Sequence, residues 1–274
     1  MVRLATAGAL LGAATFVSFP SNIARAAASS ADAVVQYTAG TAPTGYQAPS
    51  AALGELNPDT NAGNDFGYGA LTPFNAVWQG SQMVGIGAGG TLTLHLAQTA
   101  GSIGVHTGVG LNNKSPGNGQ NTDPASAYTN PRQSFVEVST DGVVFVPIGV
   151  VDFDIPSNYF DQGITSPTFQ GSPGTRAADF GKPFDGVMGD FDGKDWAGTL
   201  DVLGGSMGGE WLHVSSILPA GANFVRFGVP LGQVDPMYVD AVAVVPIPEP
   251  TSAIVLGAAC ALVLGSRRAR RNRG

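Results

Sequence analysis

The sequence is poor in cysteine and in basic side chains. Its one cysteine, Cys260, lies in a short apolar run near the C-terminus, so the region before that run has no disulfide bond to stabilise it. All 20 acidic residues lie between Asp32 and Glu249, where only six basic residues occur, giving this region a formal charge of −14 against −7 for the whole chain. Because phosphate binding needs clustered Lys and Arg, the acidity excludes nucleic acid and anionic lipid as partners of this region.

The region 29–246 also lacks the apolar stripe of an amphipathic helix and any internal repeat. The chain contains 39 glycines and 19 prolines, and only 12% of its residues are charged. This composition is typical of many short strands joined by tight turns. About 220 residues can bury a core of their own without disulfides. We therefore predict one all-β domain over residues 29–246.

Alternation of apolar and polar residues is clearest in residues 91–97. Leu92, Leu94 and Leu96 fall on one face of the predicted strand, and Thr93 and His95 fall on the other. The segment before it, residues 38–75, is irregular and rich in Gly, Pro, Ala and Asn. Loops of this length are uncommon in compact domains unless they pack as a lid or a binding loop.

A hairpin is predicted at Asp141-Gly142, which stands between two runs rich in β-branched residues. A two-residue type I′ turn needs positive φ at both positions, and Asp-Gly suits it. Pro147 lacks an N–H group, so its strand should lie at a sheet edge or contain a bulge there.

Residues 1–28 have the three parts of a secretory signal peptide. Arg3 is the positive residue at the start, and an apolar stretch follows from Leu4 to Phe19. Small residues then offer cleavage sites at Ala24, Ala26 and Ala28. We expect a signal helix that is removed during export.

Residues 247–274 form a tail with three parts in fixed order. Pro248-Glu249-Pro250 comes first, followed by an apolar run from Thr251 to Gly265. As a helix, this run would be roughly 22 Å long, which is short for a bilayer core of about 30 Å. Basic residues orient such a helix with their end in the cytoplasm, and here they are Arg267, Arg268, Arg270, Arg271 and Arg273. We predict a marginal transmembrane helix.

This tail closely resembles the PEP-CTERM sorting signal of exported proteins of Gram-negative bacteria. The resemblance implies that an exosortase-type membrane protease cuts the chain near Pro248, Glu249 and Pro250. The arginines would hold the tail in the inner membrane until then. The protein would pass through the secretion machinery to the cell surface or extracellular matrix. A plain permanent anchor is the alternative.

The domain itself resembles uncharacterised exported proteins that carry the same tail. Its motifs are similar to those of galactose-binding-like, or discoidin-like, domains, and this resemblance implies a jelly-roll-like β-sandwich without a defined reaction. The matching segments are residues 49–54, 87–94, 136–142, 224–227 and 239–242.

Few residues suggest catalysis. His95, His106 and His213 have no metal-ligand spacing and are expected to be half-exposed strand residues. Ser206 stands in a glycine-rich segment that lacks the full Gly-x-Ser-x-Gly pattern of a serine hydrolase. A glycosidase pair would be drawn from Glu137, Glu210 and several aspartates, although a solvated role is expected for Glu137, which stands in a strand beside a tight turn.

One acidic segment suggests a cation. Asp190, Asp192 and Asp195 place three carboxylates within six residues beside Gly193. Such oxygen ligands suit Ca²⁺, although the spacing is not that of an EF-hand. A solvated acidic loop is the alternative, and no other cofactor is expected.

Together these features predict an exported, non-enzymatic protein of the cell surface or matrix, with a structural or adhesive role. Two alternatives remain open. The domain could be a carbohydrate-binding module that contacts extracellular polysaccharide, or it could be a surface glycosidase.

Overall fold

The computed structural model describes residues 29–60, 69–112, 132–163 and 174–247. The predicted signal peptide and residues 248–274 of the predicted tail, with their cleavage, sorting and arginine residues, lie outside these ranges. Strands dominate the described residues, which contain one α-helix, and this confirms the predicted all-β class. The elements are β1 (Ser29–Thr38), η1 (Thr44–Tyr46), η2 (Pro49–Ala52), β2 (Val84–Ile86), β3 (Thr91–Thr107), β4 (Arg132–Ser139), β5 (Val146–Phe153), β6 (Phe160–Gln162), β7 (Arg176–Ala177), η3 (Met188–Phe191), α1 (Trp196–Leu203), β8 (Glu210–Leu212), η4 (Val214–Ser216), β9 (Ala222–Gly228) and β10 (Met237–Pro246).

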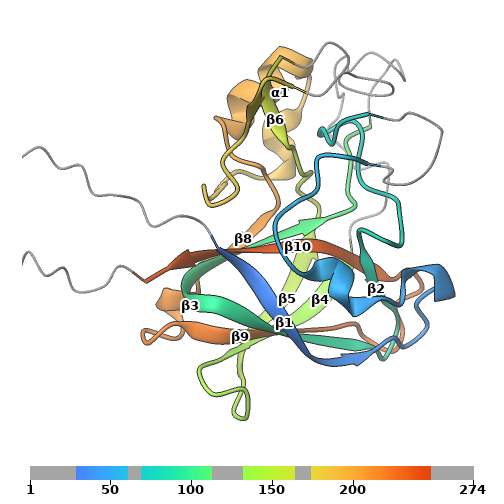
Figure 1. The fold of residues 1–274 in the computed structure, drawn as a ribbon, viewed down its shortest axis with the longest axis vertical. Helices are drawn as coiled ribbons and strands as arrows, with labels where there is room; N and C mark the ends of the chain where they lie inside the picture. The colour runs from blue at the N-terminus through green and yellow to red at the C-terminus, as the bar shows by residue number, and fades with distance from the viewer. Residues whose placement is uncertain (1–28, 61–68, 113–131, 164–173, 248–274) are drawn as a thin grey trace, which may run out of the picture.

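The long strand β3 belongs to two layers (Figure 1). Its first half, residues 91–96, pairs with β1 on one side and β9 on the other. Its second half, residues 100–107, pairs with β10 and β8. One layer therefore runs β2-β10-β3-β8, and the other runs β1-β3-β9-β4-β5. The start of β1 also pairs with β10, so the layers are joined along that side as well.

The main core lies between these layers. Leu92, Leu94 and Leu96 are all buried in it, as the alternation predicts. From the second layer, Val225 and Phe227 of β9 are fully buried, and the Phe227 ring meets that of Phe153 edge to face at 6.1 Å. This core is built from regular strands whose side chains alternate between the two faces.

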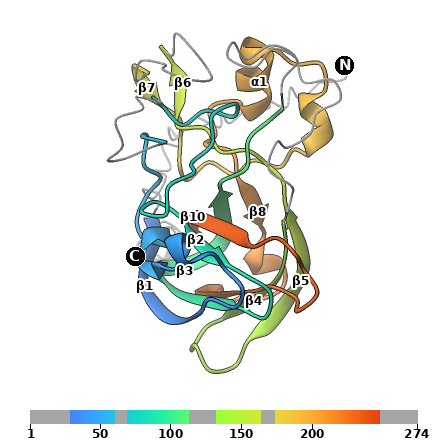
Figure 2. The same cartoon turned by 90° about the vertical axis from the view of Figure 1, so that its right-hand side faces the viewer.

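A second apolar cluster covers the opposite face of β10. Whereas Val242 and Val244 face the main core, Ala241 and Ala243 face this cluster. The other side of the cluster is supplied by the described parts of residues 56–83 and 155–209, which we call the cap. The cap forms the upper lobe in Figures 1 and 2 and carries α1, β6 and β7. The irregular segment 38–75 therefore does pack, in part as a covering layer.

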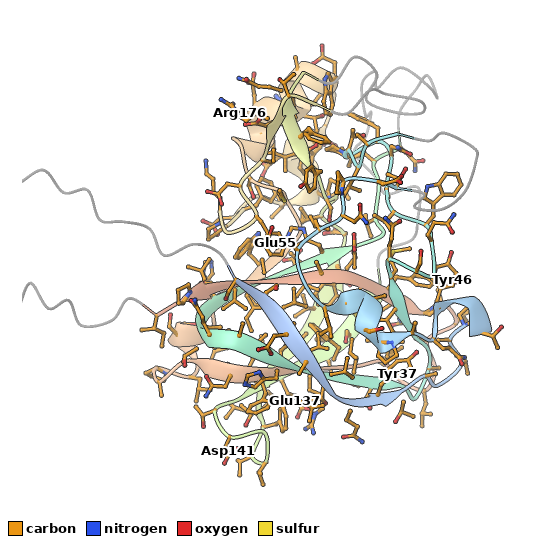
Figure 3. All side chains as sticks on the ribbon, in the orientation of Figure 1. Tyr37, Tyr46, Glu55, Glu137, Asp141 and Arg176 are labelled. Carbon is orange, nitrogen blue, oxygen red and sulfur yellow. The ribbon has the colours of Figure 1, made fainter. Side chains whose placement is uncertain are left out.

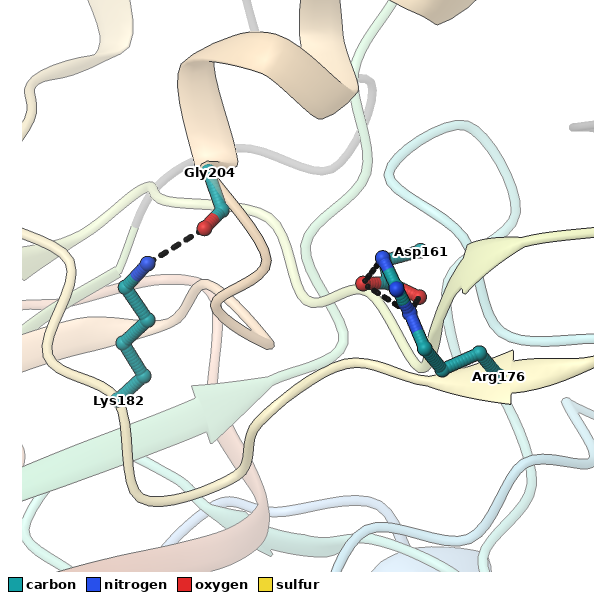
Figure 4. A network of polar contacts seen from close by, with 4 residues as sticks. All are labelled: Asp161, Arg176, Lys182 and Gly204. Carbon is teal, nitrogen blue, oxygen red and sulfur yellow. Dashed lines mark hydrogen bonds and ion pairs between the residues drawn. The ribbon is translucent and has the colours of Figure 1, made fainter.

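Two polar contacts hold the cap together (Figure 4). The Arg176 guanidinium donates to both carboxylate oxygens of Asp161, at 2.7–3.0 Å, and so joins β7 to β6. Lys182 Nζ donates to the carbonyl oxygen of Gly204 at 2.5 Å, next to the end of α1. The ammonium group thus lies at the helix C-terminus, where a positive charge is favourable.

The β4–β5 hairpin is present, but its two-residue turn is not. β4 ends at Ser139 and β5 begins at Val146, so six residues connect them. Asp141 Oδ1 accepts hydrogen bonds from the backbone N–H groups of Val143 and Val144. These bonds take the place of the inter-strand backbone bonds that a two-residue turn would have. Pro147 lies on β5, the last strand of its layer, beside a register shift, as predicted.

Among the described residues, no helix has both the length and the apolar character needed to cross a membrane. The predicted transmembrane helix falls in the tail, outside those residues.

Candidate functional site

An aromatic pocket opens at the end of the two layers, near the base of the cap. Its volume is about 190 Å³. It collects side chains from η1, from the segment before β2, and from the ends of β3, β5 and β10. The lining residues are Tyr46, Val77, Trp78, Met83, Thr107, Gly108, Val109, Phe153, Met237 and Tyr238.

Two of these aromatic side chains pack together, and one of them also binds the backbone of a third aromatic residue. The rings of Tyr46 and Tyr238 meet edge to face, with 4.9 Å between centroids. Tyr46 Oη donates to the carbonyl oxygen of Trp78 at 2.8 Å, which ties η1 to the loop opposite (Figure 3). Trp78 keeps 45% of its surface exposed although it is large and apolar. The pocket thus presents a held aromatic wall to solvent.

Glycines allow the chain segments around the pocket to lie close to one another. A Cβ atom at position 80 would overlap the carbonyl oxygen of Gly45. A Cβ atom at position 108 would lie 2.6 Å from the sulfur of Met83. Both positions therefore need glycine for the pocket to keep its shape.

The lining carries no charged side chain. Its polar groups are the tyrosine hydroxyls, the Thr107 hydroxyl and nearby backbone groups. A pocket of this kind can pack flat apolar faces and exchange a few neutral hydrogen bonds.

A group of carboxylates lies beside the pocket, where two strands separate. The backbone N–H of Gly209 donates to the carbonyl oxygen of Pro156 at 3.2 Å, and that of Asn158 donates to Met207 at 2.8 Å. The segment after β5 thus runs antiparallel to the one before β8. β5 then continues beside β4, and β8 continues beside β3 in the other layer. We call this branching point, with its side chains Asp152, Asp154 and Glu210, the fork.

The fork raises the pKa values of its own acids. Burial, together with the negative charges of Asp154 and Asp152, raises the pKa of Glu210 to about 7. Burial and the charge of Asp152 also raise the pKa of Asp154. Desolvation disfavours the ionised form, and a neighbouring like charge does the same.

Three polar side chains are buried close to the junction of cap and sheet. His106 is fully buried, stacks on Phe180 at 5.2 Å and has Nδ1 3.3 Å from the Ser157 hydroxyl. Burial lowers its pKa to about 3, so the ring is neutral. Asp240 and Asn158 also carry buried polar atoms without a partner among the described residues. Burial raises the pKa of Asp240 well above its usual range.

The histidine prediction holds for one residue and fails for another. His95 is half exposed on β3, with Nδ1 2.6 Å from Asp32 Oδ1. His106 is completely buried, because the cap covers its face of β3. The alternation of apolar and polar residues in the sequence does not predict this second covering. His213 is exposed just after β8, with Nε2 3.2 Å from Asp185.

Ser206 and Glu137 serve the fold. Ser206 is buried, donates to the carbonyl oxygen of Lys182 and accepts from the N–H of Gly208. Glu137 accepts from Arg226 Nε at 2.7 Å, and the Arg226 guanidinium lies 3.9 Å from the centre of the Phe145 ring. Neither residue lines the aromatic pocket.

The three aspartates proposed for Ca²⁺ are not gathered into a site. Asp190 accepts from the N–H of Val187 at 2.8 Å, and Asp195 caps α1 by accepting from the N–H of Gly198. Two carboxylates are therefore engaged with the backbone. No group of three or more His, Cys, Asp or Glu residues within the described ranges is arranged to hold a metal ion.

Sequence reasoning missed the pocket, and it singled out Glu210 of the fork without its neighbours Asp152 and Asp154. The pocket residues Tyr46 and Trp78 lie in irregular segments, where no periodicity marks a shared surface. The description of residues 38–75 as a lid or binding loop was the available signal. Asp154 and Glu210 are 56 residues apart, and only the pairing of their segments brings them together.

Comparisons of the chain with protein-family models, with curated proteins and with solved structures find no match.

Proposed function

We propose that this protein is an exported, non-enzymatic adhesive protein of the cell surface whose β domain binds carbohydrate. The observation that supports the carbohydrate partner is the uncharged aromatic pocket, with Trp78 exposed beside Tyr46 and Tyr238. Sugars present flat C–H faces that stack on aromatic rings, and their hydroxyls pair with neutral donors and acceptors.

The charge of the domain favours neutral glycans over acidic ones. Basic residues are few between Asp32 and Glu249, and none lines the pocket. A polysaccharide rich in uronate or sulfate would meet electrostatic repulsion from the domain as a whole.

The pocket supports binding more strongly than hydrolysis. A glycosidase places two carboxyl groups on either side of the bond that it cuts, about 5–10 Å apart. The described residues that line this pocket include no carboxylate. The fork carboxylates are not among the lining residues, so binding without cleavage is the proposal.

The two layers that share β3 are compatible with a jelly-roll-like sandwich of the galactose-binding-like type. The sequence of the tail supports delivery by a PEP-CTERM signal, in which an exosortase-type protease of the inner membrane cuts near Glu249. A domain that ends at β10, directly before Pro248, would then be released whole to the surface.

Glycan binding is tested on an array of neutral and acidic glycans with residues 29–247. Trp78→Ala should reduce binding of neutral glycans at least tenfold, because it removes the exposed ring. Phe135→Ala is the matched control, since Phe135 is an aromatic residue of similar exposure, 48%, on the outer face of β4. No binding by the wild type, or equal loss in both variants, would contradict the proposal.

Sorting is tested by intact-mass measurement of protein recovered from the cell surface. The mature form should end near Pro248-Glu249-Pro250. Glu249→Ala should slow processing, and replacement of all five tail arginines by glutamine should mislocalise the protein. Residues 251–274 still attached to the surface form would favour the permanent anchor instead.

A further inference from the structure

The fork joins the cap to both layers of the sandwich. The segment after β5 belongs to the cap, as does the segment before β8, whereas β5 and β8 themselves belong to different layers. The ladder formed by Ser157 with Gly208 and by Pro156 with Gly209 ends where Asp154 and Glu210 begin. Any separation of the two strands above this point would loosen the cap from both layers.

Like charges are concentrated at this point. The groups that act on Glu210 from the β5 side are Asp154 and Asp152. On the β3 side, Val105 pairs with Glu210, and the adjacent His106 is neutral. The buried carboxyl of Asp240 on β10 is also held in its neutral form. Among the described residues, the charges that act on Glu210 are those of Asp154 and Asp152, and both oppose its ionisation.

The fork is connected to the pocket by one residue. Phe153 lies between Asp152 and Asp154 in the chain, is buried in the main core and forms part of the pocket lining. A shift of the β5 end at the fork would move this ring. The shape of the pocket therefore depends on the spacing of the fork strands.

We propose that the fork is a pH-dependent latch, closed while Glu210 is protonated and opened by its ionisation, and that the closed form is the one that binds glycan. In the closed form the protonated Glu210 carboxyl is neutral and adds no charge to those of Asp152 and Asp154. In the open form, three negative charges repel one another across the end of the ladder. The last step, from latch to ligand, rests on the proposed function; the latch itself does not.

The direction of the effect follows from the raised pKa. In the unfolded chain Glu210 ionises near its ordinary value of 4.5, whereas in the folded chain it ionises near 7. Relative to the unfolded chain, the folded chain with the fork closed therefore has its full stability from Glu210 below about pH 4.5 and loses it as the pH rises through 7. About nine tenths of the Glu210 carboxyls are protonated one unit below the pKa, and about one tenth one unit above it.

Hydrogen exchange of the fork amides tests the latch in the absence of any ligand. Peptides covering residues 154–159 and 207–212 report the bonds donated by Asn158 and Gly209. After correction for the intrinsic pH dependence, their exchange should accelerate about fivefold to tenfold between about pH 6 and pH 8 in the wild type. Glu210→Gln, which stays neutral, should abolish this acceleration.

The matched control is Glu55→Gln, the same change at an exposed glutamate outside the fork. It should accelerate with pH as the wild type does. Equal pH dependence in the wild type and Glu210→Gln would overturn the latch. So would a pH-independent wild type.

Glycan binding by the same proteins tests the last step. The wild type should lose affinity between pH 6 and pH 8, and Glu210→Gln should not. If hydrogen exchange responds to pH but glycan affinity does not, the proposal that the latch controls the pocket is wrong. If no glycan binds at either pH while exchange responds, the proposed function fails and the latch stands.

Discussion

The two apolar clusters are built in different ways. The cluster between the layers consists mainly of Val, Leu, Ile and Ala side chains from regular strands. The cap cluster contains Phe74, Phe180, Phe184, Phe191 and Trp211, together with Met83 and Met207, largely from irregular segments. Large aromatic side chains bury much area from few positions, so a loop-rich layer can be held without strand regularity.

The two clusters meet at the pocket and the fork. Both lie where the cap meets the layers, and the pocket is lined in part by Phe153 and Met237 of the main core. Of the three tryptophans, Trp78 and Trp196 belong to the cap, and Trp211 of β8 packs in the cap cluster. Tryptophan fluorescence therefore reports the cap, and far-ultraviolet circular dichroism reports the strands, which gives each region its own probe.

The largest expected effects come from truncating one buried ring in each cluster. Phe227→Ala and Phe191→Ala both remove fully buried side chains and should each lower stability by about 3–5 kcal/mol. Phe227→Ala should shift both probes together. Phe191→Ala should shift fluorescence to lower denaturant than circular dichroism. Coincident transitions in Phe191→Ala would show that the clusters unfold as one unit.

A second prediction concerns the fit of the pocket loops. Gly80→Ala places a methyl group against the Gly45 carbonyl and should cost about 2–3 kcal/mol, with loss of glycan binding. Gly232→Ala, where no atom lies within 4 Å of the new methyl, should leave stability and binding unchanged. The measurement is denaturant unfolding followed by fluorescence. If Gly80→Ala has the stability of the wild type, the loops of the cap can move apart to admit the extra methyl group.

A third prediction uses the neutral histidine beneath the cap. The unfolded chain binds a proton at His106 below about pH 6.5, whereas the folded chain does so only near pH 3. Stability due to this group is therefore lost as the pH falls from 6.5, by about 2 kcal/mol at pH 5. His106→Phe, which keeps a ring beside Phe180, should lose less stability than the wild type between pH 7 and pH 5. Parallel losses would contradict the buried neutral ring.

The smallest effect is expected at the hairpin loop, far from both clusters. Gly142 has a φ of 74°, and a Cβ atom there would lie 3.1 Å from the Phe224 ring. Gly142→Ala should cost about 1 kcal/mol, seen equally by both probes. Val143→Ala, at the neighbouring and 81% exposed position, is the control and should change little. A loss of 3 kcal/mol or more would show that the loop contributes to stability as much as a buried core residue does.

The sequence predicted the strand core better than the cap. Leu92, Leu94 and Leu96 alternate because one face of β3 meets the main core along its first half. In the second half both faces are covered, so alternation disappears and His106 is buried. Asp141-Gly142 predicted the hairpin, but Asp141 binds the backbone of Val143 and Val144 and lengthens the turn. The Asp141 side chain takes backbone N–H groups that the strand ladder would otherwise use. Ser139 also bonds to this turn, and the Phe224 ring packs against Gly142, so the turn type depends on residues outside the Asp-Gly pair.

The pairing of β1 with β10 has a mechanical consequence. Ser29 lies opposite Val244, so the first and last strands of the domain are neighbours and their outer ends leave the molecule side by side (Figure 1). A load between those two ends would peel β1 from β10 one hydrogen bond at a time, and such peeling resists little force. A domain held by one end alone would carry its load through β3 and the layers instead. Attachment at a single end is therefore the arrangement that lets this domain bear tension.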